Sequence, residues 1–320
     1  MWQALENPNL GFMNVFSDSI ADSQRRNLQL VPELRQTKTL IAVSDYGGYD
    51  KTSQFESYAL LVACGESWTD WEHARQSLRR AFRVGKRRFA FSKMGDSRKR
   101  RALLPFLATA DALHGLLVTV LVDKSIDSLF VAQGRLDPAS ASHLSPAGHY
   151  TERTFERLMR TVHLVSFFIA GLSTAGQNVI WLTDEDEIAG NRQRLIGLSS
   201  IFGHVAGHYL PHRLGQSRCG TTESDIGSLQ IEDLAAVPDL VAGALAETLT
   251  AYYREGGVPN NPLLYLPPRN LSGKTREIIR WLSLESGRLK RLVYAIQGQT
   301  ESTALVLKRL QFHSEPLAVA

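Results

Sequence analysis

The sequence predicts an α/β protein with a mixed sheet flanked by helices. Two observations lead to this fold class. Short apolar runs bounded by glycine or polar turn residues recur along the chain, as buried strands do. Longer segments between these runs repeat their apolar residues at helical spacing. Strands come first and then alternate with helices, which favours a single main α/β domain.

Five strands are predicted. The first two cover residues 39–45 and 57–65, and their short connection favours an antiparallel hairpin. The other three are expected over residues 87–93, 116–124 and 178–187.

Helices are predicted from apolar spacing and from capping signals. They cover residues 68–82, 97–115, 155–169, 187–207 and 238–252. Pro238 is well placed at the first position of the last of these helices. Residues 272–312 are expected to be wholly helical, beginning on a Ser272 cap.

These elements divide the chain into three expected parts. Residues 1–36 are polar and mixed, and we interpret them as an N-terminal extension with at most a short helix. Residues 37–255 form the α/β domain. A proline-rich connector then introduces a C-terminal helical extension over residues 256–320.

Composition is that of an ordinary soluble globular protein, with 43% hydrophobic and 21% charged residues in 320. Two cysteines and an N-terminus without a secretory signal predict a cytoplasmic protein. The most apolar windows are shorter than the about 18 to 20 residues of a membrane span, so no membrane role is expected. No P-loop, dinucleotide fingerprint or serine-hydrolase elbow is present, which argues against those three chemistries.

Three predicted strands end in aspartate, namely Asp45, Asp123 and Asp184. Each could be a turn former. Strand ends of an α/β sheet meet at one rim, however, and carboxylates that gather there repel one another unless they share a cation. Asp239 is a fourth candidate, because it lies just inside a predicted helix next to small residues that allow close packing. The pattern predicts a site for Mg²⁺ or Mn²⁺, which prefer oxygen ligands.

The stretches AVSDYGG, FAFSKMGDSRKRR, VLVDK, VIWLTDEDE and LQIEDLAAVPDLVAGAL resemble the bacterial domain-of-unknown-function family thirty-eight hundred, whose members are similar to ribonuclease H. The resemblance covers roughly residues 39–252. It implies a ribonuclease-H-like five-stranded sheet with a divalent-metal site formed by Asp45, Asp123, Asp184 and an aspartate of the late helix. The late motif assigns either Asp239 or Asp233, and Pro238 favours Asp239. Tyr46 departs from the family, which usually has an acidic residue there.

Basic residues cluster on both sides of the predicted strand 87–93. They include Arg87, Arg88, Arg98 and Arg101. Such runs usually form a solvated helix face, but here they would also supply the positive field that nucleic acid needs. Lys93 could touch a substrate phosphate or pair with an aspartate of the rim.

His204 and His208 lie four residues apart on one predicted helical face, a spacing that can bind zinc. The metalloprotease glutamate is missing, and Pro211 is expected to end the helix before His212, so zinc is not favoured.

The sequence therefore predicts a metal-dependent nuclease that hydrolyses phosphodiesters of nucleic acid. In this hypothesis, Asp45, Asp123 and Asp239 hold the ions, and Asp184 is a further ligand or orients water. The alternative is a catalytically silent binding or scaffold module of the same fold. In either case a protein partner or a second copy could bind through the C-terminal helices.

Overall fold

The computed structural model describes residues 1–131, 134–141, 150–258, 263–264, 270–298 and 304–313. The α-helices are α1 Phe12–Arg26, α2 Trp68–Ala81, α3 Ser97–Ala110, α4 Glu152–Leu172, α5 Arg192–Tyr209, α6 Gln230–Arg254 and α7 Gly273–Ser283. The strands are β1 Thr39–Gly47, β2 Phe55–Cys64, β3 Gly115–Asp123, β4 Asn178–Thr183, β5 Ser217–Thr221, β6 Leu263–Leu264, β7 Leu289–Gly298 and β8 Leu305–Phe312.

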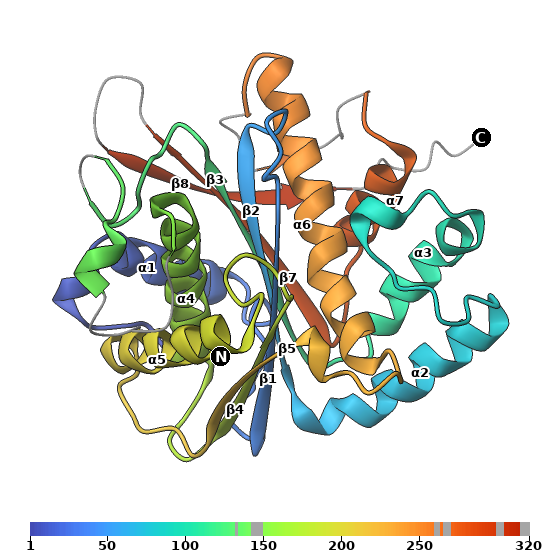
Figure 1. Cartoon of the computed structure of the whole chain (residues 1–320), viewed down its shortest axis with the longest axis horizontal. Coiled ribbons are helices and arrows are strands. Elements are labelled where there is room, and N and C mark those ends of the chain that lie inside the picture. Colours follow the sequence, from blue (N-terminus) through green and yellow to red (C-terminus); the bar gives the residue numbers. More distant parts are fainter. Residues whose placement is uncertain (132–133, 142–149, 259–262, 265–269, 299–303, 314–320) are drawn as a thin grey trace.

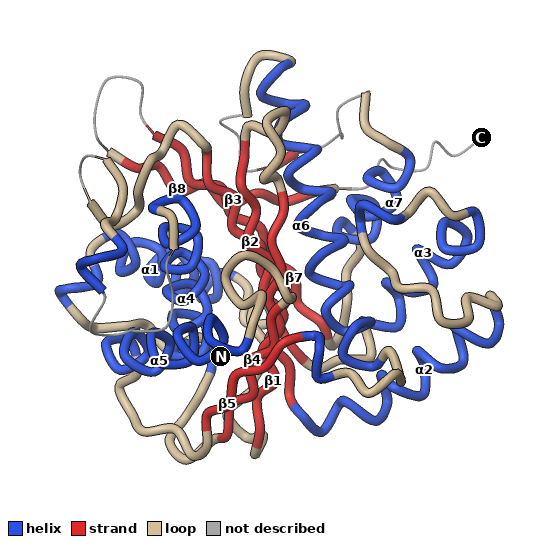
Figure 2. The backbone as a smooth tube through the Cα atoms, in the orientation of Figure 1, coloured by secondary structure: helices blue, strands red, loops and turns tan. Residues whose placement is uncertain are grey.

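The strands form one mixed sheet in the order β5-β4-β1-β2-β3-β7-β8-β6 (Figure 2). The first three strands along the chain pair as an antiparallel meander. Strand β4 then pairs parallel to β1, and β5 pairs parallel to β4. On the other side, β7 pairs parallel to β3 and antiparallel to β8. The predicted α/β class and mixed sheet are confirmed, but the sheet is wider than the five strands expected.

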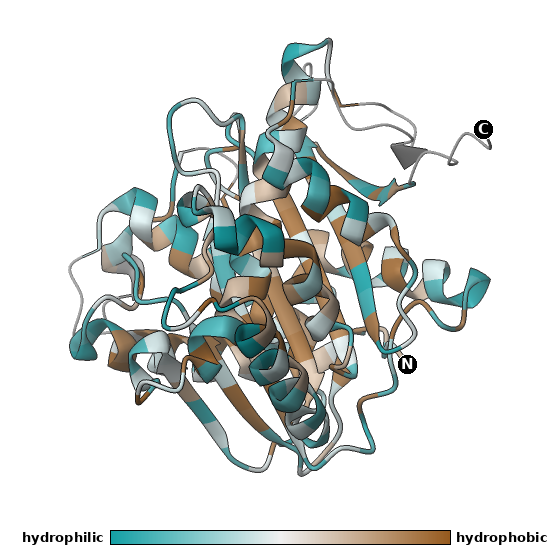
Figure 3. Cartoon of the chain, turned by 90° about the vertical axis from the view of Figure 1, so that its right-hand side faces the viewer, coloured by the Kyte–Doolittle hydropathy of each residue, from teal (hydrophilic) through white to brown (hydrophobic). Residues whose placement is uncertain are grey.

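Helices cover both faces of the sheet (Figure 1). One face carries α1, α4 and α5, and the other carries α2, α3, α6 and α7. Strand residues alternate between two separate hydrophobic clusters: Ala42 of β1 belongs to the cluster on the α4 side, and Val43 belongs to the cluster on the α6 side. Figure 3 shows the α6 side, where hydrophobic strands lie behind helices with largely hydrophilic outer surfaces.

The expected strand over residues 87–93 is wrong. This segment is irregular and contains only a short 3-10 turn, Phe91–Lys93. Strand β7, and not this segment, pairs with β3, and the backbone N–H of Phe91 donates to Asp239.

The expected helix over residues 272–312 is correct only as far as Ser283. Beyond it the chain forms β7 and β8, which complete the central sheet. Residues Leu292–Ile296 are buried without interruption, and such a run of valine, tyrosine and isoleucine is typical of a strand that is covered on both faces. The C-terminal part is therefore not a helical extension.

The N-terminal segment contains a helix of 15 residues, α1, which is longer than expected. Phe16 and Ile20 of this helix are fully buried, and the ring of Phe16 lies 5.0 Å from that of Phe167 on α4. Trp2 donates from Nε1 to Ser17 Oγ at 3.1 Å. Residues 1–36 thus contribute to the same core as α4.

Helix α6 begins eight residues before Pro238, the residue at which it was expected to start. Its first turn is capped by Asp225, whose carboxylate accepts the backbone N–H groups of Ile231 and Glu232. Among the described residues, α6 is the one helix long and apolar enough to cross a membrane, and most of it is packed inside the fold.

Candidate functional site

Asp45 lies on β1 and points to the α6 side of the sheet, because it is two residues beyond Val43. Only 8% of the residue is exposed. Its Oδ1 accepts the backbone N–H of Tyr46 at 2.6 Å. Among the described residues no basic side chain forms an ion pair with it, so this buried carboxylate lacks a compensating cation in the chain itself.

The two glycines after Asp45 and Tyr46 allow β1 to approach α6 closely. A Cβ on Gly47 would lie 3.0 Å from the backbone carbonyl carbon of Ala242, and a Cβ on Gly48 would lie 2.0 Å from the backbone oxygen of Phe55. Gly48 also has φ of +76°, a conformation that favours glycine. The expected close packing of the small residues of α6 on the sheet is confirmed.

Asp239 projects from α6 to the same rim. Its Oδ2 accepts the backbone N–H of Phe91 at 2.6 Å. Asp184, directly after β4, accepts a hydrogen bond from Thr222 Oγ1 at 3.1 Å. Asp186 lies two residues further on and accepts the backbone N–H of Ile188 at 2.9 Å. We call Asp45, Asp184, Asp186 and Asp239 the carboxylate cluster.

The carboxylates of this cluster influence one another. Burial raises the pKa of Asp45 well above its usual range, and the negative charges of Asp239 and Asp184 raise it further. Burial also raises the pKa of Asp239 to about 6; the N–H of Phe91 opposes this rise, whereas the charge of Asp184 adds to it. The pKa of Asp186 is raised to about 6, again chiefly by burial. Among the described residues, none of these carboxylates forms an ion pair with a basic side chain.

An ion would have all-oxygen ligands here, which suits a hard divalent cation. Within the part of the chain that the structure describes, no three carboxylate, histidine or cysteine side chains converge closely enough to hold a metal ion as they stand. The cluster thus has the carboxylate oxygens that a divalent cation prefers, but the side chains as they stand do not surround a single point.

Asp123 is not part of the carboxylate cluster. Asp45 pairs with Ala59, and Ala59 pairs with Thr119, so Asp123 is four residues further along and two strands away. This corresponds to about 10 Å across the sheet and about 13 Å along it. Its Oδ1 accepts hydrogen bonds from Gln54 Nε2 and from the backbone N–H of Ser125, both at 2.9 Å. The expectation that Asp123 meets Asp45 is wrong, because ending a strand at the same rim does not place residues on neighbouring strands.

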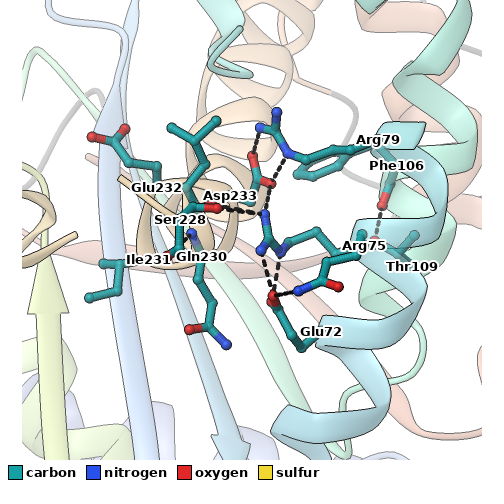
Figure 4. Close-up of polar contacts among 12 residues, drawn as sticks. Glu72, Arg75, Arg79, Phe106, Thr109, Ser228, Gln230, Ile231, Glu232 and Asp233 are labelled. Carbon is teal, nitrogen blue, oxygen red and sulfur yellow. Dashed lines mark hydrogen bonds and ion pairs between the residues drawn. The ribbon is translucent and has the colours of Figure 1, made fainter. Parts of the chain in front are cut away.

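Asp233, the other candidate in the late motif, is fully buried in an arginine clamp (Figure 4). Its Oδ2 accepts Arg75 Nη1 at 2.8 Å and Arg79 Nε at 2.5 Å, and its Oδ1 accepts Arg79 Nη2. Arg75 is held in turn by Glu72. The charge of Asp233 is thus neutralised by the protein, which leaves Asp239 as the residue of the late motif that lies in the cluster.

Two lysines lie at the rim of the cluster, and both lower the pKa of Asp239. Lys93 is exposed, as a phosphate contact would be. Lys274, on α7, donates from Nζ to the backbone oxygen of Phe91 at 2.8 Å and lies 3.7 Å from the centre of its ring. Sequence reasoning missed Lys274 because it assigned α7 to a separate extension.

Asp186 was also missed, although the run Asp-Glu-Asp-Glu after β4 contained the signal. The sequence argument considered only Asp184, the aspartate that ends the strand, and not the acidic residues that follow it in the loop. Burial of such a loop against the sheet cannot be anticipated from local sequence.

The predicted basic residues divide into paired and unpaired ones. Arg87 forms an ion pair with Asp96 at 3.2 Å, and Arg88 forms one with Glu232 at 2.9 Å. Arg98 and Arg101 are exposed on α3 and form no ion pair within the described ranges. These two arginines are the better candidates for contacts with a polyanion.

A pocket of about 560 Å³ adjoins the cluster on the α6 side. Asp239 forms part of its wall, together with Gly48, Gly243, Thr250 and Leu271. This volume is in the range that small-molecule sites occupy. One side of Asp239 therefore borders an open cavity.

His204 and His208 face one another on α5 with their Nε2 atoms 3.4 Å apart. The helix ends at Tyr209, before His212, as expected from Pro211. His212 instead contacts Ser173 Oγ at 3.0 Å. No third ligand joins the pair within the described segments, so the histidines are left outside the candidate site.

No protein-family model matches this sequence, and no curated protein matches it either. The resemblance described above therefore rests on its short motifs, and the function rests on the geometry of the carboxylate cluster.

Proposed function

We propose that this protein is a metal-dependent phosphodiesterase that acts on nucleic acid, with Asp45, Asp184 and Asp239 holding Mg²⁺ or Mn²⁺. One observation carries the proposal. The buried Asp45 of β1 and the half-buried Asp184 and Asp239, after β4 and on α6, lie near enough for the charges of Asp184 and Asp239 to raise the pKa of Asp45, and none of the three pairs with an arginine among the described residues. A bound divalent cation supplies the missing charge.

Strand order supports the ribonuclease-H-like part of the proposal. Strands β1 to β3 form an antiparallel meander, β4 and β5 continue parallel to β1, and α6 follows β5 across the sheet. The resemblance implies a five-stranded mixed sheet, and the proposal takes these five strands as that core, with β5 in place of the strand expected over residues 87–93. In this proposal β7, β8, α1 and α7 are additions around that core.

The residues divide into separate tasks. A divalent ion at such a site supplies a Lewis acid that stabilises charge on the phosphate oxygens. Lys93 and Lys274 lie on the cationic side of the cluster and attract the phosphate. Asp186, whose pKa is raised to about 6, is largely ionised at neutral pH and can accept a proton near the site. The exposed Arg98 and Arg101 hold the strand further away.

Two aspartates at the same rim provide a matched test. Asp239→Asn should abolish Mn²⁺-dependent cleavage of labelled single-stranded DNA and RNA, and also the rise in melting temperature that Mn²⁺ causes. Asp123→Asn should keep both, because Asp123 is outside the cluster. If calorimetry detects no binding of Mn²⁺ to the wild-type protein at millimolar concentrations of the ion, the proposal must be withdrawn.

A catalytically silent module of the same fold is the second candidate. It is favoured by the open arrangement of the carboxylates, since no three metal-ligating side chains in the described residues converge on one point. Such a module would bind nucleic acid without cleaving it, and Asp239→Asn would leave binding unchanged. In the described residues after 258, α7 is the one helix, and β7 and β8 belong to the sheet, so a partner that binds C-terminal helices would have to use α7.

A further inference from the structure

We propose that Arg157 is a positioning residue that, from the opposite face of the sheet, joins the loop after β1 to the loop after β4 next to the carboxylate cluster. Its effect on the loops follows from the fold and does not depend on the proposed function. Its effect on cation binding rests on the proposed function. The two effects are measured separately below.

Arg157 lies on α4 with only 6% of its side chain exposed. Its Nη2 and Nε atoms lie 3.2 and 3.4 Å from Glu56 Oε1 on β2. Its Nη1 donates to Glu187 Oε2 at 3.0 Å, and its guanidinium carbon lies 3.6 Å from the centre of the Tyr49 ring. One planar group thus contacts a strand and two loops.

The loop after β4 carries Asp184 and Asp186, and the loop after β1 begins directly beyond the strand that carries Asp45. Tyr49 follows Asp45 by four residues, across the tight Gly47–Gly48 turn. Glu187 directly follows Asp186 and is three residues beyond Asp184. Holding Tyr49 and Glu187 to one guanidinium therefore limits how far the β1 and β4 ends of the cluster can move apart.

The geometry of the contact explains why arginine is needed. Glu56 anchors one edge of the guanidinium from inside the sheet, Glu187 binds a second nitrogen, and Tyr49 stacks on the flat face. A lysine ammonium could keep one ion pair but could not make the forked and stacked contacts together.

Arg160 is a matched control on the same helix. It is equally buried, with 3% of its side chain exposed, and it also pairs with Glu56. Its remaining partners are Glu156 and the backbone oxygens of Ile126 and Asp127, which belong to the segment after β3. Loss of Arg160 should therefore destabilise the fold as loss of Arg157 does, without releasing either loop of the cluster.

The experiment compares Arg157→Met with Arg160→Met by hydrogen exchange and by calorimetry with Mn²⁺ alone. We expect faster exchange in residues 46–53 and 184–191 only for Arg157→Met. We also expect Mn²⁺ affinity to fall about tenfold in that variant, a typical loss for residues that orient metal ligands, and to change little in Arg160→Met. Arg157→Lys should resemble Arg157→Met in loop exchange.

Two outcomes would overturn the inference: unchanged exchange of both loops in Arg157→Met, or equal effects of both substitutions. If the wild-type protein binds no Mn²⁺, the proposed function fails, and the exchange comparison still decides the role of Arg157. Should Arg157→Met not fold, Glu187→Ala removes one contact at the surface, with the exposed Glu185→Ala as its control. Equal loop exchange in those two variants would also overturn it.

Discussion

The two faces of the sheet treat buried carboxylates in opposite ways. Glu56 on β2 faces α4, where Arg157 and Arg160 pair with it, and their charges outweigh the effect of burial so that its pKa is lowered. Asp45 on the neighbouring strand faces α6, where burial raises its pKa and the charges of Asp239 and Asp184 raise it further. The difference shows where the protein balances a buried carboxylate with its own arginines and where, in the proposed function, a divalent cation would supply the balance.

The same contrast occurs within α6. Asp233 is clamped by Arg75 and Arg79, whereas Asp239, six residues later, faces Asp45 and Asp184. Desolvating a carboxylate is costly in both places, but only Asp233 recovers the cost through ion pairs inside the chain. We infer that Asp233 serves stability and that Asp239 serves the site.

The largest expected effect comes from breaking the clamp. Asp233→Ala leaves two arginines around an empty buried position, and we expect the free energy of unfolding to fall by about 3 to 5 kcal/mol. Asp239→Asn removes a repelled charge and should keep or raise stability. Urea unfolding of both variants in EDTA measures the difference. Equal losses would erase the contrast between the two residues.

An intermediate effect is expected in the pH dependence of stability. Asp239 has a pKa raised from 3.8 to about 6, so the folded state binds its proton more tightly than the unfolded state. Its stabilising contribution is complete below the unfolded value and is lost as the pH rises through about 6. Glu56 affects stability in the opposite direction. Its pKa is lowered in the folded state, so its stabilising contribution is present above the pKa of the unfolded state and is lost as the pH falls.

Metal-free wild-type protein should therefore lose stability relative to Asp239→Asn between pH 4 and 7, by on the order of 1 to 3 kcal/mol. Urea titrations of both proteins at several pH values measure this difference. A difference that stays constant over the range would show that Asp239 is not buried beside other carboxylates.

The smallest expected effect concerns the exposed arginines. If Arg98 and Arg101 neutralise phosphates, replacing both with alanine should reduce the slope of log affinity against log salt by roughly 1 to 2. Replacing Arg87 and Arg88 should reduce it less, since both already pair with acidic residues. Fluorescence anisotropy with labelled single strands in EDTA measures both slopes. Identical slopes for wild type and the Arg98, Arg101 variant would remove the nucleic-acid interface from the proposal.

Local sequence determined several features by itself. The apolar runs of β1, β2, β3 and β4 predict strands because β-branched and aliphatic residues bounded by polar turns have few other stable conformations. The Ser272 cap gives the start of α7, since its side chain accepts the N–H of Thr275. Asp45 was found because a carboxylate at the end of a buried strand is costly without a partner.

Only the tertiary structure decided what each carboxylate meets. Four aspartates look alike in sequence. Asp123 accepts a hydrogen bond from Gln54, Asp233 is paired with arginines, and Asp184 and Asp239 share the cluster with Asp45. Likewise, β7 becomes a strand beside β3 although 165 residues lie between the end of β3 and the start of β7. Sequence periodicity reports burial along the chain, whereas charge balance and strand pairing depend on residues that become neighbours only through folding.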